Sequence, residues 1–270
     1  KYVINADKIS NYHIVGLPRI GKSSLLKAFK AMVLENHYSH DLVVFYISLD
    51  ECNSPNDMWR IIGKGIRKEL KKQFRSCDKY TNFIDELEFE DVNENKIDYE
   101  YVCSVARCMK ASGFLGLILI DEFDNFSTIA TKGTVGQVRT LFSGSEFGLR
   151  AVVASRRMVE RIEKEVEGAL NSNVSILAPT FINGYKLKAF NEDDMKDYWA
   201  TVEEKIGVAV SSKYKEEVNY YVGTHPCLLN LLNGSLWAEK ETKDYICDDV
   251  SNLKLSEELI NKLHDSFNWA

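Results

Sequence analysis

Short apolar runs alternate with helix-like segments along the first two thirds of the chain. The runs are rich in β-branched and aromatic residues and are too short for helices of ordinary length, so they predict buried strands. Because strands that alternate with helices form a parallel sheet covered on both faces, we expect an α/β fold. The predicted strands are Tyr12–Val15, Leu42–Leu49, Leu115–Ile120, Leu149–Ala154 and Tyr185–Leu187.

Between these runs, apolar residues recur every three or four positions, which predicts helices with one buried face. Residues 57–75 show the clearest segregation, with Trp59 and Ile62 on one side and basic residues on the other. Two polar stretches are expected to be an irregular insertion (residues 76–98) and a linker (Ser127–Gly136). The predicted helices are Lys22–Leu34, residues 57–75, Tyr99–Ala111, Gln137–Phe142 and one that begins at Met158.

The strand pattern stops near residue 190. Asn191 and Asp194 resemble a capping box, with Asp in place of the usual Glu or Gln, and apolar residues then repeat at helical spacing. Further helices are expected at 211–222, 226–238 and 256–268. We therefore expect two domains, a sheet domain at residues 1–190 and a small all-helical domain at residues 191–270.

Composition narrows the class of protein. The chain has 270 residues, 45% of them hydrophobic, and this balance is typical of a globular protein rather than a disordered or collagen-like one. No run approaches the roughly 18–20 apolar residues of a membrane span, and no secretion signal is evident. The six cysteines lack paired metal-ligand spacing. We expect a cytoplasmic protein with reduced thiols and no membrane partner.

The net charge of −6 is unevenly distributed. Residues 60–75 carry seven basic groups and one acid, whereas residues 76–98 carry eight acids and two lysines. The basic helix face is either solvated or a contact for nucleic acid or an acidic partner surface. No Phe or Tyr alternates within it, so a stacking platform for bases is not indicated. The acidic stretch is a candidate to fold back over this face.

A glycine-rich motif follows the first predicted strand. The segment Gly16-Leu17-Pro18-Arg19-Ile20-Gly21-Lys22-Ser23 fits G-x-x-x-x-G-K-[ST] at a strand-to-helix turn, which is typical of a phosphate-binding loop. Lys22 would reach the β- and γ-phosphates, and the Ser23 hydroxyl would bind Mg²⁺. We therefore expect ATP and Mg²⁺ as cofactors. The predicted nucleotide-binding residues of this motif are Gly16, Pro18, Arg19, Ile20, Gly21, Lys22, Ser23 and Ser24.

The strand Leu115–Ile120 ends in two acids, Asp121 and Glu122. A buried parallel strand delivers them to the carboxyl edge of the sheet, beside the phosphate loop. Asp121 is predicted to bind Mg²⁺ together with Ser23. Glu122 is predicted to orient or deprotonate the attacking water. A solvated or capping role is expected for the nearby Asp124.

The strand Leu149–Ala154 ends in Ser155-Arg156-Arg157. Guanidinium stays charged and forms forked bonds to phosphate, so an arginine here would contact the γ-phosphate. Arg156 lies nearer the strand end and is the preferred candidate, with a surface pair of arginines as the alternative. Lys22, Glu122 and Arg156 form the predicted catalytic set.

These motifs, followed by the helical segment Gly223-Thr224-His225-Pro226-Cys227-Leu228-Leu229, resemble the STAND branch of AAA+-related NTPases, and especially the archaeal-type ATPase group. The resemblance extends from about Tyr12 to about Trp237. It implies a P-loop NTPase sheet domain followed by a helical lid, in which Pro226 and His225 contact the nucleotide. From the residues alone, His225-Pro226 is a helix start with proline in its first turn.

The resemblance implies a slowly hydrolysing ATP switch of a signalling or defence protein. Binding of ATP would close the lid and promote homo-oligomerisation, and ADP would remain after hydrolysis. The family's upstream element and its usual sensor or effector domains are not seen here, so we expect a module of a longer protein. The alternative is a DNA-associated AAA+ ATPase that resembles replication initiators and loaders, for which a DNA-contacting wing is not evident.

Overall fold

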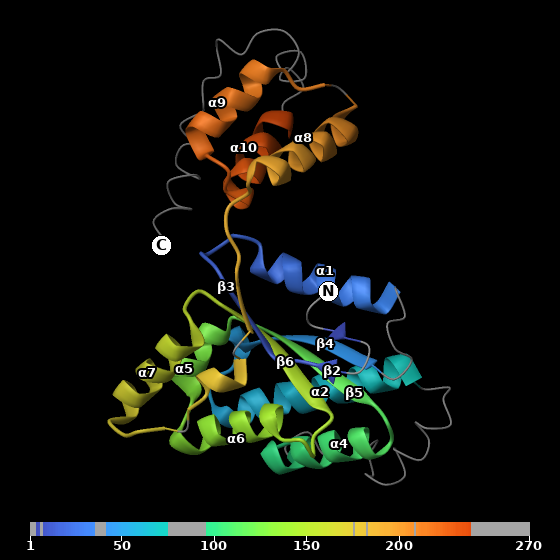
Figure 1. Ribbon diagram of the computed structural model, residues 1–270, viewed down its shortest axis with the longest axis vertical. Coiled ribbons are helices and arrows are strands. Elements are labelled where there is room, and N and C mark those ends of the chain that lie inside the picture. The colour runs from blue at the N-terminus through green and yellow to red at the C-terminus, as the bar shows by residue number, and fades with distance from the viewer. Residues whose placement is uncertain are drawn as a thin grey trace. The chain divides into compact units, whose positions relative to one another are not determined.

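A parallel sheet forms the centre of the sheet domain. The structure, a computed structural model, describes residues 4–5, 8–35, 42–74, 96–174, 176–181, 183–207 and 209–238. The sheet has five strands in the order β4-β5-β6-β3-β7, all parallel, which confirms the predicted α/β fold (Figure 1). The strands are β3 (Tyr12–Val15), β4 (Leu42–Ser48), β5 (Leu115–Asp121), β6 (Leu149–Ser155) and β7 (Asn183–Lys186). The two-residue strands β1 (Ile4–Asn5) and β2 (Lys8–Ile9) pair with each other outside it.

The register of the sheet brings the carboxyl ends of its strands to one edge. Val15, the last residue of β3, is paired with Ser155 at the end of β6. Ser48, the last residue of β4, is paired with Asp121 at the end of β5. The segments that follow these strands therefore lie next to one another, and they are the segments that carry the predicted chemistry.

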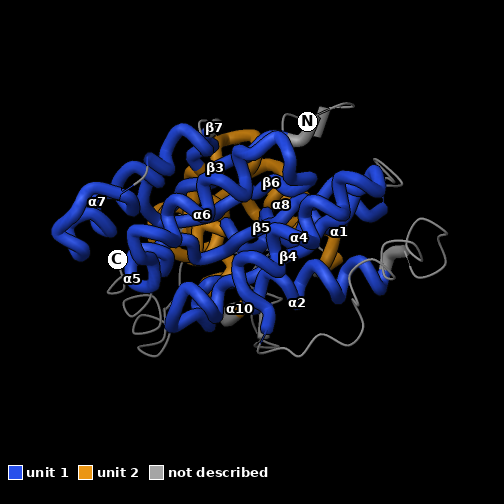
Figure 2. Tube along the Cα trace, turned by 90° about the horizontal axis from the view of Figure 1, so that it is seen from below, with its two compact units in different colours: residues 1–16, 22–186 blue, residues 17–21, 187–270 orange. Residues whose placement is uncertain are grey.

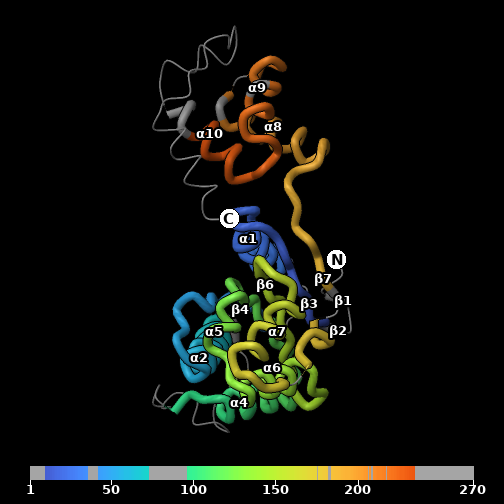
Figure 3. Tube along the Cα trace, turned by 90° about the vertical axis from the view of Figure 1, so that its left-hand side faces the viewer, coloured from blue at the N-terminus to red at the C-terminus, as the bar shows by residue number. Residues whose placement is uncertain are grey.

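Helices cover both faces of the sheet (Figures 1 and 3). One face is covered by α1 (Lys22–Glu35), which packs on β4, β5 and β6. The opposite face is covered by α2 (Pro55–Phe74), α4 (Tyr99–Ala111) and α6 (Lys132–Ser143), which pack on β4, β5 and β6 respectively. Trp59, Ile62 and Ile66 of α2 are at most 1% exposed, so the apolar side predicted for this helix is its buried side.

The stretch predicted as a linker, Ser127–Gly136, is largely helical. It contains most of α5 (Phe126–Ile129) and the start of α6. Thr131 caps α6 in a capping box with Thr134, and Ile129 is buried in the core. The linker prediction is wrong because the polar composition of this stretch reflects helix capping rather than a loop.

Short helical elements complete the sheet domain. The 3₁₀ segment η1 follows β4, η3 follows β5, and α7 follows β6. A further 3₁₀ segment, η4, precedes β7. Their bounds are η1 (Leu49–Glu51), η3 (Phe123–Asn125), α7 (Val159–Leu170) and η4 (Ala178–Phe181).

The chain divides into two compact units, one of residues 1–16 and 22–186 and one of residues 17–21 and 187–270 (Figure 2). The second unit contains α8 (Glu192–Ile206), α9 (Ser212–Val222) and α10 (Pro226–Ala238), at the positions that helical periodicity predicts. Its core is built around Trp199, Tyr214 and Leu229, and Asn191 and Asp194 form the expected capping box of α8.

Two predictions fall wholly or mainly on residues that the structure does not describe. They are the helix at 256–268 and the acidic insertion at 76–98, of which only residues 96–98 are described. None of the described helices is both long enough and apolar enough to cross a membrane.

Candidate nucleotide-binding site

The glycine motif forms the turn between β3 and α1. Gly21 has a φ of 104°, a conformation that residues with a side chain rarely adopt, and a Cβ added there would meet no atom within 4 Å. The N–H of Gly16 donates to the carbonyl of Ser155 at 3.2 Å, which fastens the start of the loop to β6. The first turn of α1 contains no acidic residue, so the positive end of its dipole is left for an anion.

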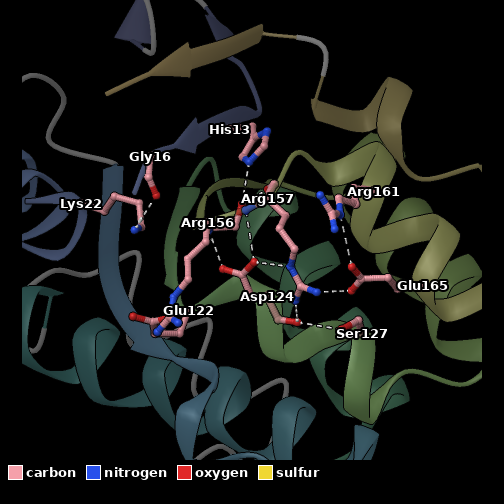
Figure 4. Close-up of polar contacts among 11 residues, drawn as sticks. His13, Gly16, Lys22, Glu122, Asp124, Ser127, Arg156, Arg157, Arg161 and Glu165 are labelled. Atoms are coloured by element: carbon pink, nitrogen blue, oxygen red, sulfur yellow. Dashed lines mark hydrogen bonds and ion pairs between the residues drawn. The ribbon is translucent and has the colours of Figure 1, made fainter. Parts of the chain in front are cut away.

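Lys22 lies at the start of α1 and is 5% exposed. Its Nζ donates to the carbonyl oxygen of Gly16 at 2.9 Å, so the side chain curls back over the loop (Figure 4). Burial lowers the pKa of Lys22, while the carboxylates of Glu122, Asp124 and Asp121 act in the opposite direction. A lysine in this position is poised for an anion, because a phosphate would replace a neutral carbonyl as its partner.

Asp121 ends β5 and is 2% exposed. Both of its carboxylate oxygens have donors. The phenol of Tyr46 on β4 donates to Oδ2 at 2.7 Å, and the N–H of Glu122 donates to Oδ1 at 3.0 Å. Burial and the bond to Asp121 raise the pKa of Tyr46, so the phenol stays protonated and remains a donor. The carboxylate is thereby held in one orientation at the edge of the sheet.

Glu122 faces Arg156 across this edge. The closest oxygen and nitrogen of the two side chains, Oε2 and Nη2, are 3.8 Å apart, and 26% of the Glu122 side chain and 49% of the Arg156 side chain are exposed. Burial raises the pKa of Glu122, and Arg156 opposes that shift. The two residues that were predicted to act on the water and on the γ-phosphate are therefore partners of each other.

Arg157 has a different environment from Arg156. Its Nε donates to Oδ1 of Asp124 at 2.8 Å, and its Nη1 donates to Glu165 of α7 (Figure 4). Asp124 also accepts the backbone N–H groups of residues 156 and 157, and its side chain is 13% exposed. The solvated alternative for Asp124 is wrong, because its carboxylate is mostly buried and caps two backbone N–H groups of the segment after β6, which holds that segment in place.

Two further polar residues, Tyr46 and His13, belong to this edge and were missed by sequence reasoning. Nε2 of His13 lies 2.7 Å from Oγ of Ser155, and both side chains are buried. A signal for Tyr46 exists in the sequence, because Tyr46 and Ser48 are the polar members of an alternating pattern at the end of β4. No comparable signal exists for His13, which lies within a short apolar run.

The second unit contains residues 17–21 of the glycine motif as well as the helices α8, α9 and α10. His225 belongs to the same unit as residues 17–21 of the loop, and burial lowers the pKa of His225. Pro226 begins α10, as expected of a proline in a first turn.

The remaining predicted residues lie where the motif puts them. Ile20 is buried, Pro18 and Ser23 are half-buried, and Arg19 and Ser24 are exposed. Ser23 and Ser24 occupy the first turn of α1. An open glycine turn, a buried lysine and an acid-free helix start form a donor set that fits a polyphosphate, and Ser23 with Asp121 offers the oxygen ligands that Mg²⁺ prefers.

No protein-family model and no curated protein matches the sequence. Two solved structures of similar fold are a Walker-type ATPase of Pyrococcus abyssi and the ORC2 protein of Aeropyrum pernix in its ADPNP–ADP complexes. The first is 14% identical, covers 96% of this chain and 71% of its own, and superposes with a TM-score of 0.56. The second is 12% identical, covers 95% of this chain and 61% of its own, also with a TM-score of 0.56. The chain therefore shares the fold of these two proteins, a parallel sheet covered by helices on both faces.

Proposed function

We propose that this chain binds ATP together with Mg²⁺ and hydrolyses it. The observation that carries the proposal is the meeting of a phosphate-type loop, an acid-tipped strand and an arginine at one edge of the sheet. Lys22, Glu122 and Arg156 all belong to the same compact unit, and Glu122 and Arg156 are among the charges that act on Lys22. Positive and negative side chains close together suit phosphoryl transfer to water, because the positive groups stabilise the charge on the phosphate oxygens and a carboxylate can accept the proton of the water.

Each residue has a distinct part in this proposal. The loop N–H groups and Lys22 bind the phosphates, and Ser23 and Asp121 hold Mg²⁺, which supplies charge neutralisation of the phosphate oxygens. Arg156 would turn from Glu122 to the γ-phosphate, since a phosphate dianion is the stronger partner for guanidinium. Glu122 is then released to accept the proton of the attacking water, and its raised pKa makes it a better acceptor.

Two uses of such an ATPase remain, and each has a supporting observation. The initiator-like, DNA-associated use has the better support, because this fold is similar to that of the ORC2 protein, which is of the initiator type. The switch of the STAND type is supported by the grouping of residues 17–21 of the loop with the helices of the second unit. Under that second use, residues 17–21 would transmit the binding of phosphate to the helices of their own unit.

The binding part of the proposal is tested with Lys22→Ala. Loss of a charged phosphate contact is expected to weaken binding of a fluorescent ATP analogue about tenfold to a hundredfold. Lys164→Ala removes the same charge from an exposed position on α7 and is expected to bind as the parent does. Equal affinity of Lys22→Ala and the parent would show that the loop does not hold the phosphates.

The hydrolytic part is tested with Glu122→Gln, which keeps the shape of the side chain and removes the base. We expect unchanged ATP affinity and turnover lower by about 10²–10⁴. Turnover at the parent rate would refute the role of Glu122. The same samples distinguish the two uses. A several-fold rise in ATP turnover on addition of duplex DNA supports the initiator-like use. ATP-dependent oligomers of Glu122→Gln, with no effect of DNA on turnover, support the switch.

A further inference from the structure

The backbone of Glu122 is in an unusual conformation. Its φ of 49° and ψ of 45° lie in the left-handed region, which residues with a Cβ seldom adopt. Such a conformation costs free energy and persists only where its surroundings enforce it. Glu122 joins β5 to η3, so the direction of its side chain depends on whatever holds the residues that follow.

Asp124 ties one side of this turn to the segment after β6. Its carboxylate accepts the N–H of Arg156 at 2.6 Å, the N–H of Arg157 at 3.2 Å and the Nε of Arg157 at 2.8 Å. Its backbone carbonyl accepts from Nη2 of Arg157 at 3.2 Å and from Oγ of Ser127 at 3.0 Å. Five hydrogen bonds thus join one residue of the turn to its neighbours (Figure 4).

The segment that Asp124 grips is itself anchored. Oγ of Ser155 donates to the carbonyl of Arg157 at 2.5 Å, and the guanidinium of Arg157 reaches Glu165 on α7. The guanidinium of Arg157 is engaged in these contacts, whereas the guanidinium of Arg156 faces Glu122, with Nη2 3.8 Å from Oε2. The hydrogen bonds of Asp124 therefore hold the backbone on both sides of the Glu122–Arg156 pair.

Asn125 ties the other side of the turn to η1. Its Nδ2 donates to the carbonyl of Leu49 at 2.6 Å and to the carbonyl of Cys52 at 3.1 Å. Oγ1 of Thr128 donates to Oδ1 of Asn125 at 2.6 Å, so the amide has one orientation. The N–H of Asn125 also donates to the carbonyl of Glu122 at 3.0 Å, which closes the turn.

We propose that Asp124 and Asn125 are positioning residues for ATP hydrolysis. Together they hold Glu122 in its left-handed conformation from two sides and keep its carboxylate opposite Arg156. Neither residue touches the nucleotide in this scheme, which rests on the proposed function. Their hydrogen bonds are set before ATP arrives, so the carboxylate need not be reoriented during the reaction.

The test uses two isosteric exchanges in the full chain. Asp124→Asn gives up a carboxylate oxygen and its charge, and Asn125→Asp gives up the donor that reaches Leu49 and Cys52. We expect each to lower kcat at least about tenfold, with KM for ATP changed less than about twofold, because binding and alignment are separate. Glu100→Gln and Asn56→Asp make the same chemical changes at exposed positions on α4 and α2, and parent kinetics are expected of both.

A double variant separates positioning from general damage. If Asp124 acts through Glu122, then Asp124→Asn lowers kcat in the parent but has no further effect in the Glu122→Gln background. Equal reductions in both backgrounds, or a loss of ATP affinity in place of a loss of kcat, would overturn the proposal.

Amide hydrogen exchange tests the same device without any activity. The N–H of Glu122 donates to Asp121. In both Asp124→Asn and Asn125→Asp, its hydrogen exchange is expected to be at least about tenfold faster than in the two control variants. A parent protein that does not hydrolyse ATP would defeat the proposed function alone. Unchanged exchange at Glu122 in both variants would defeat the two-sided hold, whatever the activity.

Discussion

Replacing Tyr46 by Phe removes a single oxygen and tests how Asp121 is held. The phenol donates to Oδ2 of Asp121 at 2.7 Å, and Asp121 is 2% exposed, so water does not readily replace the lost donor. Hydrogen bonds to charged groups contribute about 1.5–3 kcal/mol to stability. The ring remains in Tyr46→Phe, and with it the packing and the Lys27 ammonium that lies 5.3 Å from the ring centroid.

We expect Tyr46→Phe to lower the free energy of unfolding by about 1.5–3 kcal/mol, and Tm by about 3–12 °C for a protein of this size. Thermal and urea unfolding of the full chain measure both quantities. Tyr185→Phe is the matched control, because that side chain is 59% exposed and its change is expected to stay within about 0.5 kcal/mol.

A double-mutant cycle with Asp121→Ala isolates the bond itself. The coupling free energy between the two positions is expected to be about 1.5–3 kcal/mol. A coupling below about 0.5 kcal/mol, or a Tyr46→Phe protein as stable as the control, would refute the idea that the phenol holds the carboxylate.

Three further changes test the packing of charge and polar groups. Burial lowers the pKa of His13 from 6.5, so below about pH 6.5 the folded protein binds fewer protons than the unfolded chain. The free energy of unfolding should therefore decrease as the pH is lowered below about 6.5, and His13→Gln should reduce that decrease in urea titrations. Asn233→Ala should cost about 2–4 kcal/mol, because Tyr214 and Tyr198 lose their buried partner; a loss under about 1 kcal/mol contradicts this. Glu69→Ala should lower the free energy of unfolding by about 1–3 kcal/mol, because it breaks the 2.7 Å ion pair with Lys30. If this loss disappears in 1 M salt, the pair behaves as a solvent-exposed ion pair and the expectation is contradicted.

Local pattern was enough for the elements and for the principal chemical groups. The alternation of short apolar runs with amphipathic segments predicts the parallel sheet, and the predicted ends of two strands, Ile120 and Ala154, lie one residue before the observed ends, Asp121 and Ser155. The glycine motif before Lys22 has a local physical requirement, a turn with positive φ, that can be read from residue type. Polar segments were harder, because Thr131 and Thr134 read as linker residues when they in fact cap a helix.

The sequence by itself determined which residues could do the chemistry and at which end of the sheet they lie. The tertiary structure decided how they are held. Asp124 and Arg157 are 33 positions apart, and Tyr46 and Asp121 are 75 apart. Those partnerships depend on which strands become neighbours and in what register, which no local pattern encodes. The same reason explains why Arg156 faces Glu122 while the adjacent Arg157 is bound to Asp124: adjacent side chains at a strand end point in different directions, and only the packed neighbours assign a partner to each.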